Sequence, residues 1–276
     1  MIKIVYEEFK EALEAVLLKG KYSSSTTSKI GVVNDCVVAI IENPPRTLVH
    51  QEKGTDNTYY CNLTFANASD TLIAQVTVLC ETMYSPEDMP KMFFFDIEKC
   101  LKYLSAFNKK KTLVLNFHEG KLELIQDSKT ASMPLAVEHR NVAFISKLKS
   151  ITIPTEGYPA FGQSVLTTKL LVKGEELAKG IKNSSVVGTA TYKLDYENLE
   201  EGNFLWLSSS NFHKTDSMKD RIPILVSEGE SVTIEFSAPL DKFCKGPTQL
   251  FLATDKPMLM VCADRKLVIA PRLRGN

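Results

Sequence analysis

The sequence lacks long apolar runs, paired cysteines and an excess of charge of either sign. No apolar stretch approaches the roughly 20 residues that a membrane-spanning helix needs, so no membrane partner is expected. The start lacks the basic segment, apolar stretch and cleavage site of a signal peptide, and we expect none. The 33 lysines and arginines equal the 33 aspartates and glutamates, so total charge predicts no particular partner.

The cysteine pattern excludes a disulfide framework or a simple zinc site. Six cysteines are scattered through the chain, mostly in apolar stretches, and none forms a Cys-x-x-Cys pair. This pattern is typical of buried, reduced thiols in an intracellular compartment. Asn-x-Ser/Thr sites at Asn62, Asn67 and Asn183 are then chance matches, because glycosylation requires the secretory route. The cysteines are Cys36, Cys61, Cys80, Cys100, Cys244 and Cys262.

Common catalytic motifs are also missing. The four histidines lie in separate segments, none at a metal-binding spacing, and no phosphate-binding glycine loop or Gly-x-Ser-x-Gly elbow occurs. We therefore predict no catalytic residue, no metal site and no cofactor, and favour a binding protein over an enzyme. An enzyme whose catalytic groups are distant in sequence is the alternative.

What the sequence does contain is many short strands and a few short helices. Apolar residues recur at helical spacing in 7–18, 96–107, 173–182 and 239–245, with Asp96 placed as an N-cap and Gly20 as a stop. Strand patterns occupy 29–42, 71–80, 112–126, 231–236 and 249–270. Because strands outnumber helices and no regular βαβ alternation occurs, we predict an α+β fold.

The two halves of the chain share one order of elements: strand, helix, hairpin strands, second helix, closing strands. Between them, residues 140–163 contain prolines and glycines and lack a strong period, which is typical of a connector. We predict a first domain over 1–139, a connector over 140–163 and a second domain over 164–276. A single α+β domain with one long loop is the alternative.

The end of the chain resembles the C-terminus of sliding DNA clamps of the proliferating-cell-nuclear-antigen (PCNA) type. Residues 252–272 read LATDKPMLMVCADRKLVIAPR, two strands with a turn at 263–265 and an Ala-Pro ending. In that family an Asp-x-Pro-Leu strand precedes a strand ending in Leu-Ala-Pro-Lys. Stretches 92–102, 112–125, 151–154 with Tyr158, and 170–181 resemble the family in the expected order. The segment 44–66 is longer than expected, and the first helix is acidic.

The resemblance implies a clamp fold of two topologically similar domains, each with sheets outside and two short helices inside. It implies a homotrimeric ring around duplex DNA that tethers the replicative polymerase and other DNA-processing proteins, with a clamp loader as a further partner. The expected location is with DNA, in the cytoplasm or nucleoid, or in the nucleus of a eukaryote. The alternatives are a monomeric or dimeric factor that grips DNA by charge, a subunit of a hetero-oligomeric ring, and a scaffold that does not bind DNA.

Sequence-independent DNA binding needs diffuse positive charge facing the phosphates. Lysines near the predicted helices could supply it, although lysines also occur on any solvated helix face. The first helix argues the other way, because four glutamates at 7, 8, 11 and 14 outnumber Lys10. The predicted DNA-binding residues are Lys19, Lys21, Lys99, Lys102, Lys109, Lys110, Lys111, Lys179, Lys182, Lys242 and Lys245.

The resemblance also implies a surface for partner peptides, formed by the connector and the tail. An apolar anchor in a desolvated pocket is the usual source of affinity at such sites. The alternative is that the two connector isoleucines only hold a loop against the core. The predicted residues are Ile151, Ile153, Pro257, Val268, Ala270, Pro271 and Arg272.

Ring closure would join edge strands of neighbouring subunits head to tail. The expected edges lie near Ser132–Glu138 and Phe204–Ser210. Trp206, the single tryptophan, lies in the second of these and is assigned to the core.

Overall fold

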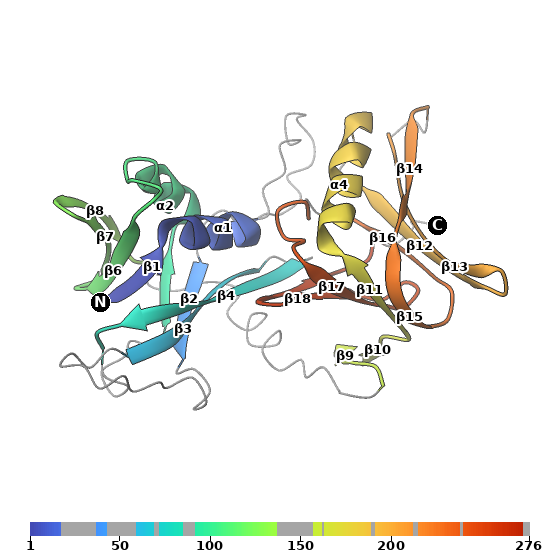
Figure 1. The fold of residues 1–276 in the computed structure, drawn as a ribbon, viewed down its shortest axis with the longest axis horizontal. Helices are drawn as coiled ribbons and strands as arrows, with labels where there is room; N and C mark the ends of the chain where they lie inside the picture. Colours follow the sequence, from blue (N-terminus) through green and yellow to red (C-terminus); the bar gives the residue numbers. More distant parts are fainter. Residues whose placement is uncertain are drawn as a thin grey trace. The chain divides into compact units, whose positions relative to one another are not determined.

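The computed structural model describes residues 1–17, 37–42, 59–68, 72–84, 92–136, 157–161, 163–188, 191–211, 215–237 and 240–272, without the side chains of 37–42 and 59. The chain separates into two compact units (Figure 1). Unit one holds the described residues up to 67 and from 75 to 136, and unit two holds residue 68, residues 72–74 and those from 157 onward. Most of the predicted connector 140–163 lies outside the described residues, so its limits stay a prediction.

Unit one is built on strands in the order β5-β2-β3-β4-β1-β6-β7-β8. They are β1 (Ile2–Val5), β2 (Val37–Glu42), β3 (Tyr59–Ala68), β4 (Leu72–Thr82), β5 (Met92–Phe95), β6 (Thr112–His118), β7 (Lys121–Gln126) and β8 (Lys129–Pro134). A bridge between Phe94 and Ala136 brings the chain after β8 back beside β5. The predicted hairpin over 112–126 is confirmed, and Glu119 and Gly120 both have the positive φ that a tight two-residue turn requires.

Two helices pack in the described residues of unit one, as the periodicity predicts. They are α1 (Tyr6–Leu17) and α2 (Ile97–Leu104). The apolar side of α1 is buried, and its Phe9 ring lies 5.4 Å from that of Phe65. The buried Tyr6 hydroxyl donates to the Leu104 carbonyl at 3.1 Å, which fixes the two helices to each other.

The predicted N-cap of α2 is confirmed. Asp96 has extended backbone angles and accepts a hydrogen bond from the Lys99 N–H at 2.9 Å. The cap explains why the helix starts here, directly after the buried end of β5.

In the part of unit two that the structure describes, there are two sheets and one longer helix. One sheet has the order β15-β11-β17-β18-β19 and the other β14-β13-β12-β16. Beside them lies the small hairpin of β9 (Ala160–Phe161) and β10 (Ser164–Val165), and α4 (Gly174–Ser184) is followed by the short helix η2 (Ser185–Val187). The sheet strands are β11 (Thr168–Lys173), β12 (Tyr192–Leu199), β13 (Gly202–Ser210), β14 (Ser217–Ile222), β15 (Ile224–Gly229), β16 (Val232–Phe236), β17 (Pro247–Leu252), β18 (Met258–Cys262) and β19 (Arg265–Ile269).

A glycine allows α4 to approach the second sheet closely. A Cβ atom at Gly180 would lie 2.9 Å from the Ile222 side chain and 3.0 Å from the Leu207 side chain. The buried side of α4 includes Leu177 and Ile181, as the spacing predicts. No helix within these described parts of the chain is long and apolar enough to cross a membrane.

The predicted helix over 239–245 is wrong. Residues 241–243 form a turn, in which the N–H groups of Phe243 and Cys244 donate to the Leu240 carbonyl at 2.9 and 3.1 Å. Gly246 has a positive φ and β17 starts at Pro247, so the segment ends after a single turn. One turn makes too few hydrogen bonds to offset the free-energy cost of starting a helix.

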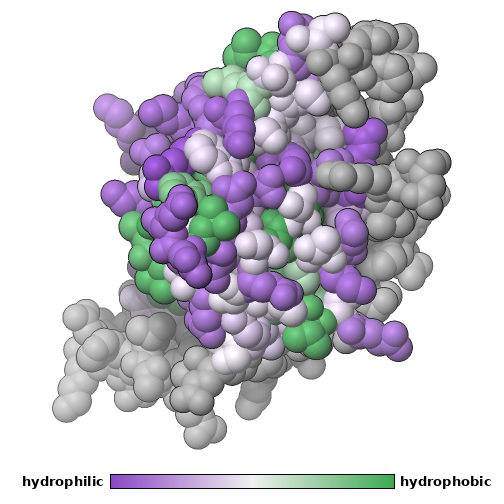
Figure 2. All heavy atoms as spheres, turned by 90° about the vertical axis from the view of Figure 1, so that its right-hand side faces the viewer, coloured by the Kyte–Doolittle hydropathy of each residue, from purple (hydrophilic) through white to green (hydrophobic). Residues whose placement is uncertain are grey.

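Two predictions about β13 are also wrong. Trp206 is half-buried on the outward face, because the alternation of the strand places Leu205 and Leu207 in the core instead. Nor is β13 an edge: it pairs with both β12 and β14, and β14 is the last strand of the sheet among the described residues. The side of unit two seen in Figure 2 is mostly hydrophilic with separate apolar groups. In unit one, β8 ends its strand order, as predicted near Ser132.

Candidate nucleic-acid interface

Unit one carries five of the predicted lysines on α2 and on the turn that follows it. Lys99 and Lys102 are three residues apart and therefore share one face of α2. Lys102 is exposed, and half-buried Lys99 places its ammonium 5.9 Å from the Tyr103 ring centre. The other three are exposed in the turn that leads into β6. We call Lys99, Lys102, Lys109, Lys110 and Lys111 the α2 lysine cluster.

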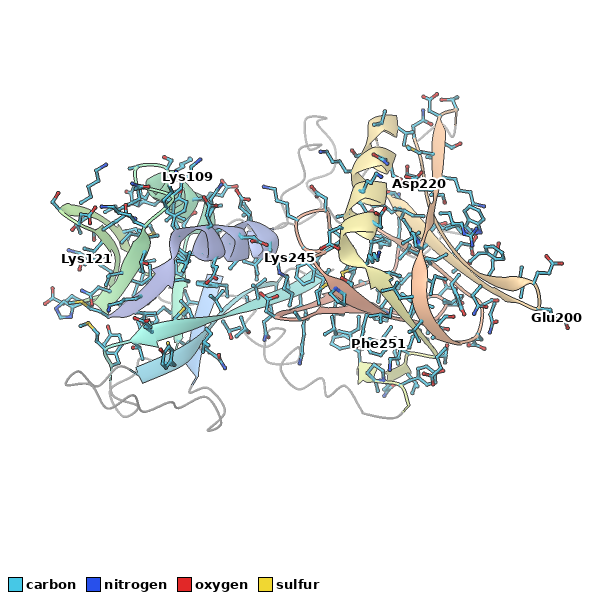
Figure 3. All side chains as sticks on the ribbon, viewed as in Figure 1. Lys109, Lys121, Glu200, Asp220, Lys245 and Phe251 are labelled. Atoms are coloured by element: carbon cyan, nitrogen blue, oxygen red, sulfur yellow. The ribbon has the colours of Figure 1, made fainter. Side chains whose placement is uncertain are left out.

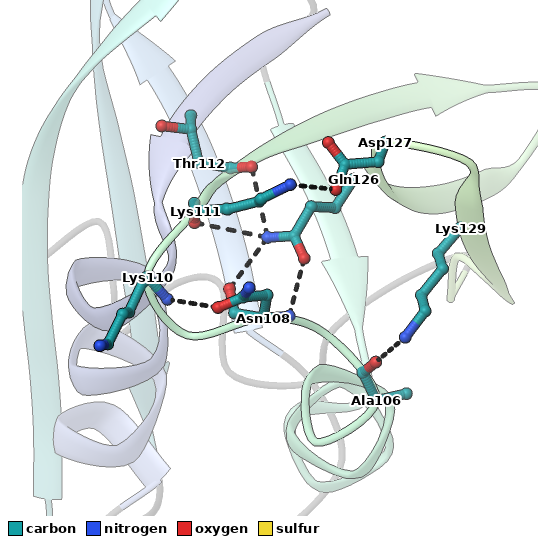
Figure 4. Close-up of polar contacts among 8 residues, drawn as sticks. All are labelled: Ala106, Asn108, Lys110, Lys111, Thr112, Gln126, Asp127 and Lys129. Atoms are coloured by element: carbon teal, nitrogen blue, oxygen red, sulfur yellow. Dashed lines mark hydrogen bonds and ion pairs between the residues drawn. The ribbon is translucent and has the colours of Figure 1, made fainter.

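A buried glutamine shapes the turn of this cluster (Figure 4). Gln126, which is 5% exposed, accepts a hydrogen bond from the Asn108 N–H at 2.7 Å and donates to the Asn108 carbonyl at 3.0 Å. Its amide also lies 3.4 Å from the carbonyls of Lys111 and Thr112. The Asn108 side chain in turn accepts from the Lys110 N–H at 3.0 Å. The lysines thus project from a backbone whose polar groups are satisfied from inside the fold.

The charges of the turn are not equally available. Lys111 forms an ion pair with Asp127 at 2.6 Å, whereas the Lys110 side chain points away from this network in Figure 4. Lys129, from β8, donates to the Ala106 carbonyl at 3.1 Å and so satisfies a carbonyl just after α2. Figure 3 places Lys109 near α2.

Unit two carries a second group of lysines, on α4 and on the turn before β17. Lys179 and Lys182 are exposed on one side of α4, opposite the buried positions. Lys242 and Lys245 are exposed on the turn, and Figure 3 labels Lys245. We call these four residues the α4 lysine cluster.

Gly246 connects the two parts of the α4 lysine cluster. Its carbonyl accepts from the Gly174 N–H at 2.7 Å, and its N–H donates to Glu175 Oε1 at 2.8 Å. The hydrogen bond from the Gly246 N–H holds the pKa of Glu175 below its ordinary value. A Cβ at Gly174 would lie 2.6 Å from Thr248 Oγ1 and 2.7 Å from the backbone nitrogen of Lys245, so only glycine fits at this contact.

A buried arginine also holds the turn before β17. Arg265, which is 3% exposed, donates through Nη1 to the carbonyls of Lys242 and Phe243 at 3.0 and 3.2 Å. It therefore satisfies carbonyls that a continuing helix would have paired. Asp264 Oδ1 lies 3.5 Å from its Nε.

The first helix adds little positive charge, as its composition predicts. Glu7 and Glu8 are exposed at its start, and Lys10 is paired with Glu14 at 3.9 Å. Lys19 and Lys21 lie outside the described residues. The predicted DNA-binding residues that are described therefore fall into one cluster in each unit.

The residues that shape both clusters were missed by sequence reasoning, although two of them left a signal. Gln126 follows Leu122 and Leu124 in the buried phase of β7, and Arg265 precedes Leu267 and Ile269 in that of β19. A polar side chain in the apolar phase of a strand needs a partner in the interior. Here those partners are backbone groups of the lysine turns.

The described tail residues of the predicted peptide surface come together at one end of β18 and β19. Pro257 and Ala270 lie one step beyond the last pair, Met258 and Ile269. Both are half-buried, as is Pro271, whereas Val268 is only 4% exposed. Ile151 and Ile153 lie outside the described residues.

Arg272 fixes the end of the described tail within unit two. Its N–H donates to the Glu235 carbonyl at 2.7 Å, and its guanidinium donates to the Thr191 hydroxyl. The tail is therefore held beside β16, with Ala270 and Pro271 on the way.

No cluster of acidic, histidine or cysteine side chains suited to a metal ion occurs in the described parts of the chain. The thiols there are buried, and burial raises the pKa of Cys61 to about 11. Such thiols are protonated at neutral pH and are poor nucleophiles.

Comparison with solved structures identifies the architecture. No family model and no curated protein matches the chain. A. fulgidus PCNA bound to the C-terminal region of FEN-1 matches with a TM-score of 0.65 and 14% identity, over 100% of both chains. The Bacillus subtilis DNA polymerase sliding clamp matches with a TM-score of 0.65 and 16% identity over 99% of this chain, and the Borrelia burgdorferi DNA polymerase III subunit beta with 0.64 and 12% over 99%. This chain spans 64% of each of these bacterial chains. The chain has the sliding-clamp fold.

Proposed function

We propose that this protein is a sliding clamp that encircles duplex DNA and tethers a DNA polymerase and other DNA-processing proteins. The observation that carries the proposal is the match to a PCNA over the full length of both chains. A fold alone does not determine function. The two lysine clusters add support, because they place exposed positive charge on the helices and turns that the clamp resemblance assigns to DNA.

The lysine clusters suit a protein that holds DNA without reading it. Ammonium groups on long, flexible side chains attract phosphates as point charges and carry no base-specific hydrogen-bond pattern. The α2 and α4 clusters are spread over separate elements, so each phosphate contact is weak and exchangeable. In a clamp, the closed ring retains the DNA, and the charges need only keep the duplex centred and mobile.

A chain of two units matched end to end with a PCNA favours a ring of three copies. We propose that the ring closes head to tail between β8 of one copy and β14 of the next, since each of these strands ends its strand order. This replaces the expected edge at Phe204–Ser210 by the neighbouring strand.

Partner proteins would bind at the tail. Pro257, Ala270 and Pro271 are half-buried and apolar, which is the character of a site that receives an apolar peptide anchor. The A. fulgidus PCNA in the matching structure is bound to the C-terminal region of FEN-1. For this chain we propose the same class of partner: short segments of polymerases and other DNA-processing proteins, with a clamp loader acting on the ring. The protein itself would act without catalysis or a cofactor.

Solution mass across a concentration series tests the proposed ring. At 30.8 kDa per chain, three copies give 3 × 30.8 = 92.4 kDa. A constant 30.8 kDa at high concentration contradicts the homotrimer and favours the monomeric factor that grips DNA by charge. A ring that forms only with other subunits would give 30.8 kDa alone and a larger mass with those subunits.

A further inference from the structure

Strand β14 is an edge strand whose side chains are held by contacts on both faces of the sheet. On one face, Ile222 packs beside Gly180 of α4, and Asp220 accepts from Asn183 at 3.4 Å. On the other face, Lys219 and Arg221 lie on the outward side of the sheet. Within the described parts of the chain, β14 pairs only with β13, so its outer backbone edge is available to another strand.

Two aromatic rings fix the positions of the β14 cations. Lys219 Nζ lies 4.2 Å from the centre of the Trp206 ring, and the Arg221 guanidinium carbon lies 4.6 Å from that of Phe204. Trp206 is held in turn by a hydrogen bond from its Nε1 to Glu197 at 3.0 Å. Cation–π contacts of this kind restrict the side chains. Both positive charges therefore stay close to the strand rather than swinging away from it.

The position of these charges matters for pairing between two copies of β14. A twofold axis that continues the sheet in antiparallel fashion must place residues of the same face opposite each other. If Asp220 faces its own copy, Lys219 faces Arg221 twice, and the two Asp220 carboxylates oppose each other as well. If the axis passes Lys219 or Arg221, that residue faces its own copy. Each of these three registers places one cation directly opposite another, which is destabilising across strands.

We propose that Lys219 and Arg221 are specificity residues that disfavour pairing of β14 with β14 of a second copy in the three registers centred on residues 219 to 221. The edge is thereby left for a different strand. β8 suits it, since its sequence KTASMP contains one charged residue, Lys129, at its start. This last step rests on the proposed function, whereas the block on self-pairing does not. Charged side chains on edge strands are a common means of excluding wrong partners.

Charge reversal provides a direct test. In the register with Asp220 at the axis, Lys219→Glu turns both Lys–Arg contacts into Glu–Arg contacts, and Arg221→Glu turns them into Lys–Glu contacts. Each single variant should tighten self-pairing by about tenfold. A species of 2 × 30.8 = 61.6 kDa should then appear in light scattering at concentrations where the wild type is a monomer. In the double variant Lys219→Glu/Arg221→Glu, a glutamate faces a glutamate of the other copy, so like charges are opposed again. The double variant should therefore behave like the wild type.

The pattern across the four proteins decides the matter. A dimer in both single variants, but in neither the wild type nor the double variant, supports the inference. Absence of the dimer from both folded single variants, or equal dimerisation of the double variant, overturns it. Circular dichroism checks the fold, and either single variant serves if the other misfolds. The wild-type mass at high concentration reports separately on the trimer, so the ring and the specificity claim fail independently.

Discussion

The side-chain amide of Gln126 pairs with both backbone groups of Asn108, accepting from its N–H at 2.7 Å and donating to its carbonyl at 3.0 Å. This contact joins the buried interior of unit one to the lysine turn on its surface. Gln126→Leu removes the amide but fills the space, and should lower the free energy of unfolding by about 1–3 kcal/mol because part-buried backbone groups of the turn each lose a hydrogen bond. Urea denaturation measures the change. A loss near zero would mean that water replaces the amide.

Gln126→Glu is the matched variant for this contact. An ionised glutamate still accepts from the Asn108 N–H but cannot donate to the carbonyl. We expect the free energy of unfolding of Gln126→Glu to be lower than that of the wild type at neutral pH. Part of this loss should be recovered in acid, where the protonated carboxyl donates again. An equal difference from the wild type at both pH values would mean that the hydrogen bond donated to the Asn108 carbonyl does not contribute to stability.

Charge reversal in the α2 lysine cluster should weaken DNA binding without unfolding the protein. Lys102 and Lys109 are exposed, so Lys102→Glu/Lys109→Glu should reduce affinity for duplex DNA and polymerase stimulation, and should flatten the salt dependence of binding. Fluorescence anisotropy at several salt concentrations measures both. Unchanged binding would exclude these residues from the DNA-facing surface.

Lys121→Glu is the control for that experiment. Lys121 is also exposed in unit one, but it starts β7 at the turn end of the hairpin, about 17 Å from the end where Gln126 lies. It should leave DNA binding nearly unchanged. An equal loss for Lys121→Glu would show that only net charge matters.

Two glycines of α4 should respond differently to alanine. At Gly174 a Cβ would meet backbone atoms of Lys245 and Gly246 at 2.7 and 2.8 Å, which cannot move without displacing the lysine turn. Gly174→Ala should therefore destabilise the protein by about 1–3 kcal/mol. At Gly180 the close atoms are side-chain ends of Ile222 and Leu207, which can shift, and alanine gains about 1 kcal/mol of helix propensity. Thermal unfolding should rank Gly174→Ala clearly below Gly180→Ala; the reverse order would contradict the described contact.

Two substitutions in the tail should affect peptide binding and protein stability separately. Pro271 is half-buried, so Pro271→Ala should weaken binding of a clamp-binding peptide while the free energy of unfolding stays nearly unchanged. Val268 is 4% exposed, so Val268→Ala should mainly destabilise, by about 1–3 kcal/mol. Peptide titration calorimetry and urea denaturation measure the two effects. Full peptide affinity in Pro271→Ala would move the docking site away from the tail.

Local patterns in the sequence predict much of this fold. Helical spacing and the Asp96 cap locate three helices, and strand alternation locates the hairpin over 112–126, because each signal depends on nearby residues. The errors concern long-range contacts. Whether 239–245 continues as a helix depends on the carbonyl partners supplied by Arg265 and on Gly246 contacting α4. The role of β13 as an inner strand depends on β14, which carries only a weak apolar alternation.

The candidate site was predictable in its residue types but not in its arrangement. Lysines near helices suggest a phosphate-facing surface from composition alone. Their support by Gln126 and Arg265 depends on side chains that reach from strands far along the chain. A polar residue in the buried phase of a strand signals that some partner exists, but the sequence does not identify the partner.

The proposed ring would hold DNA by enclosing it. The most direct measurement uses linear duplex DNA attached to a bead at one end, onto which the protein threads from the open end. Half of the sample is then capped at that end with a bulky bound protein, and both halves are washed at high salt, which screens the lysine contacts. A closed ring predicts that protein stays on the capped DNA and leaves the open DNA. Equal loss from both would contradict enclosure and assign the binding to charge alone.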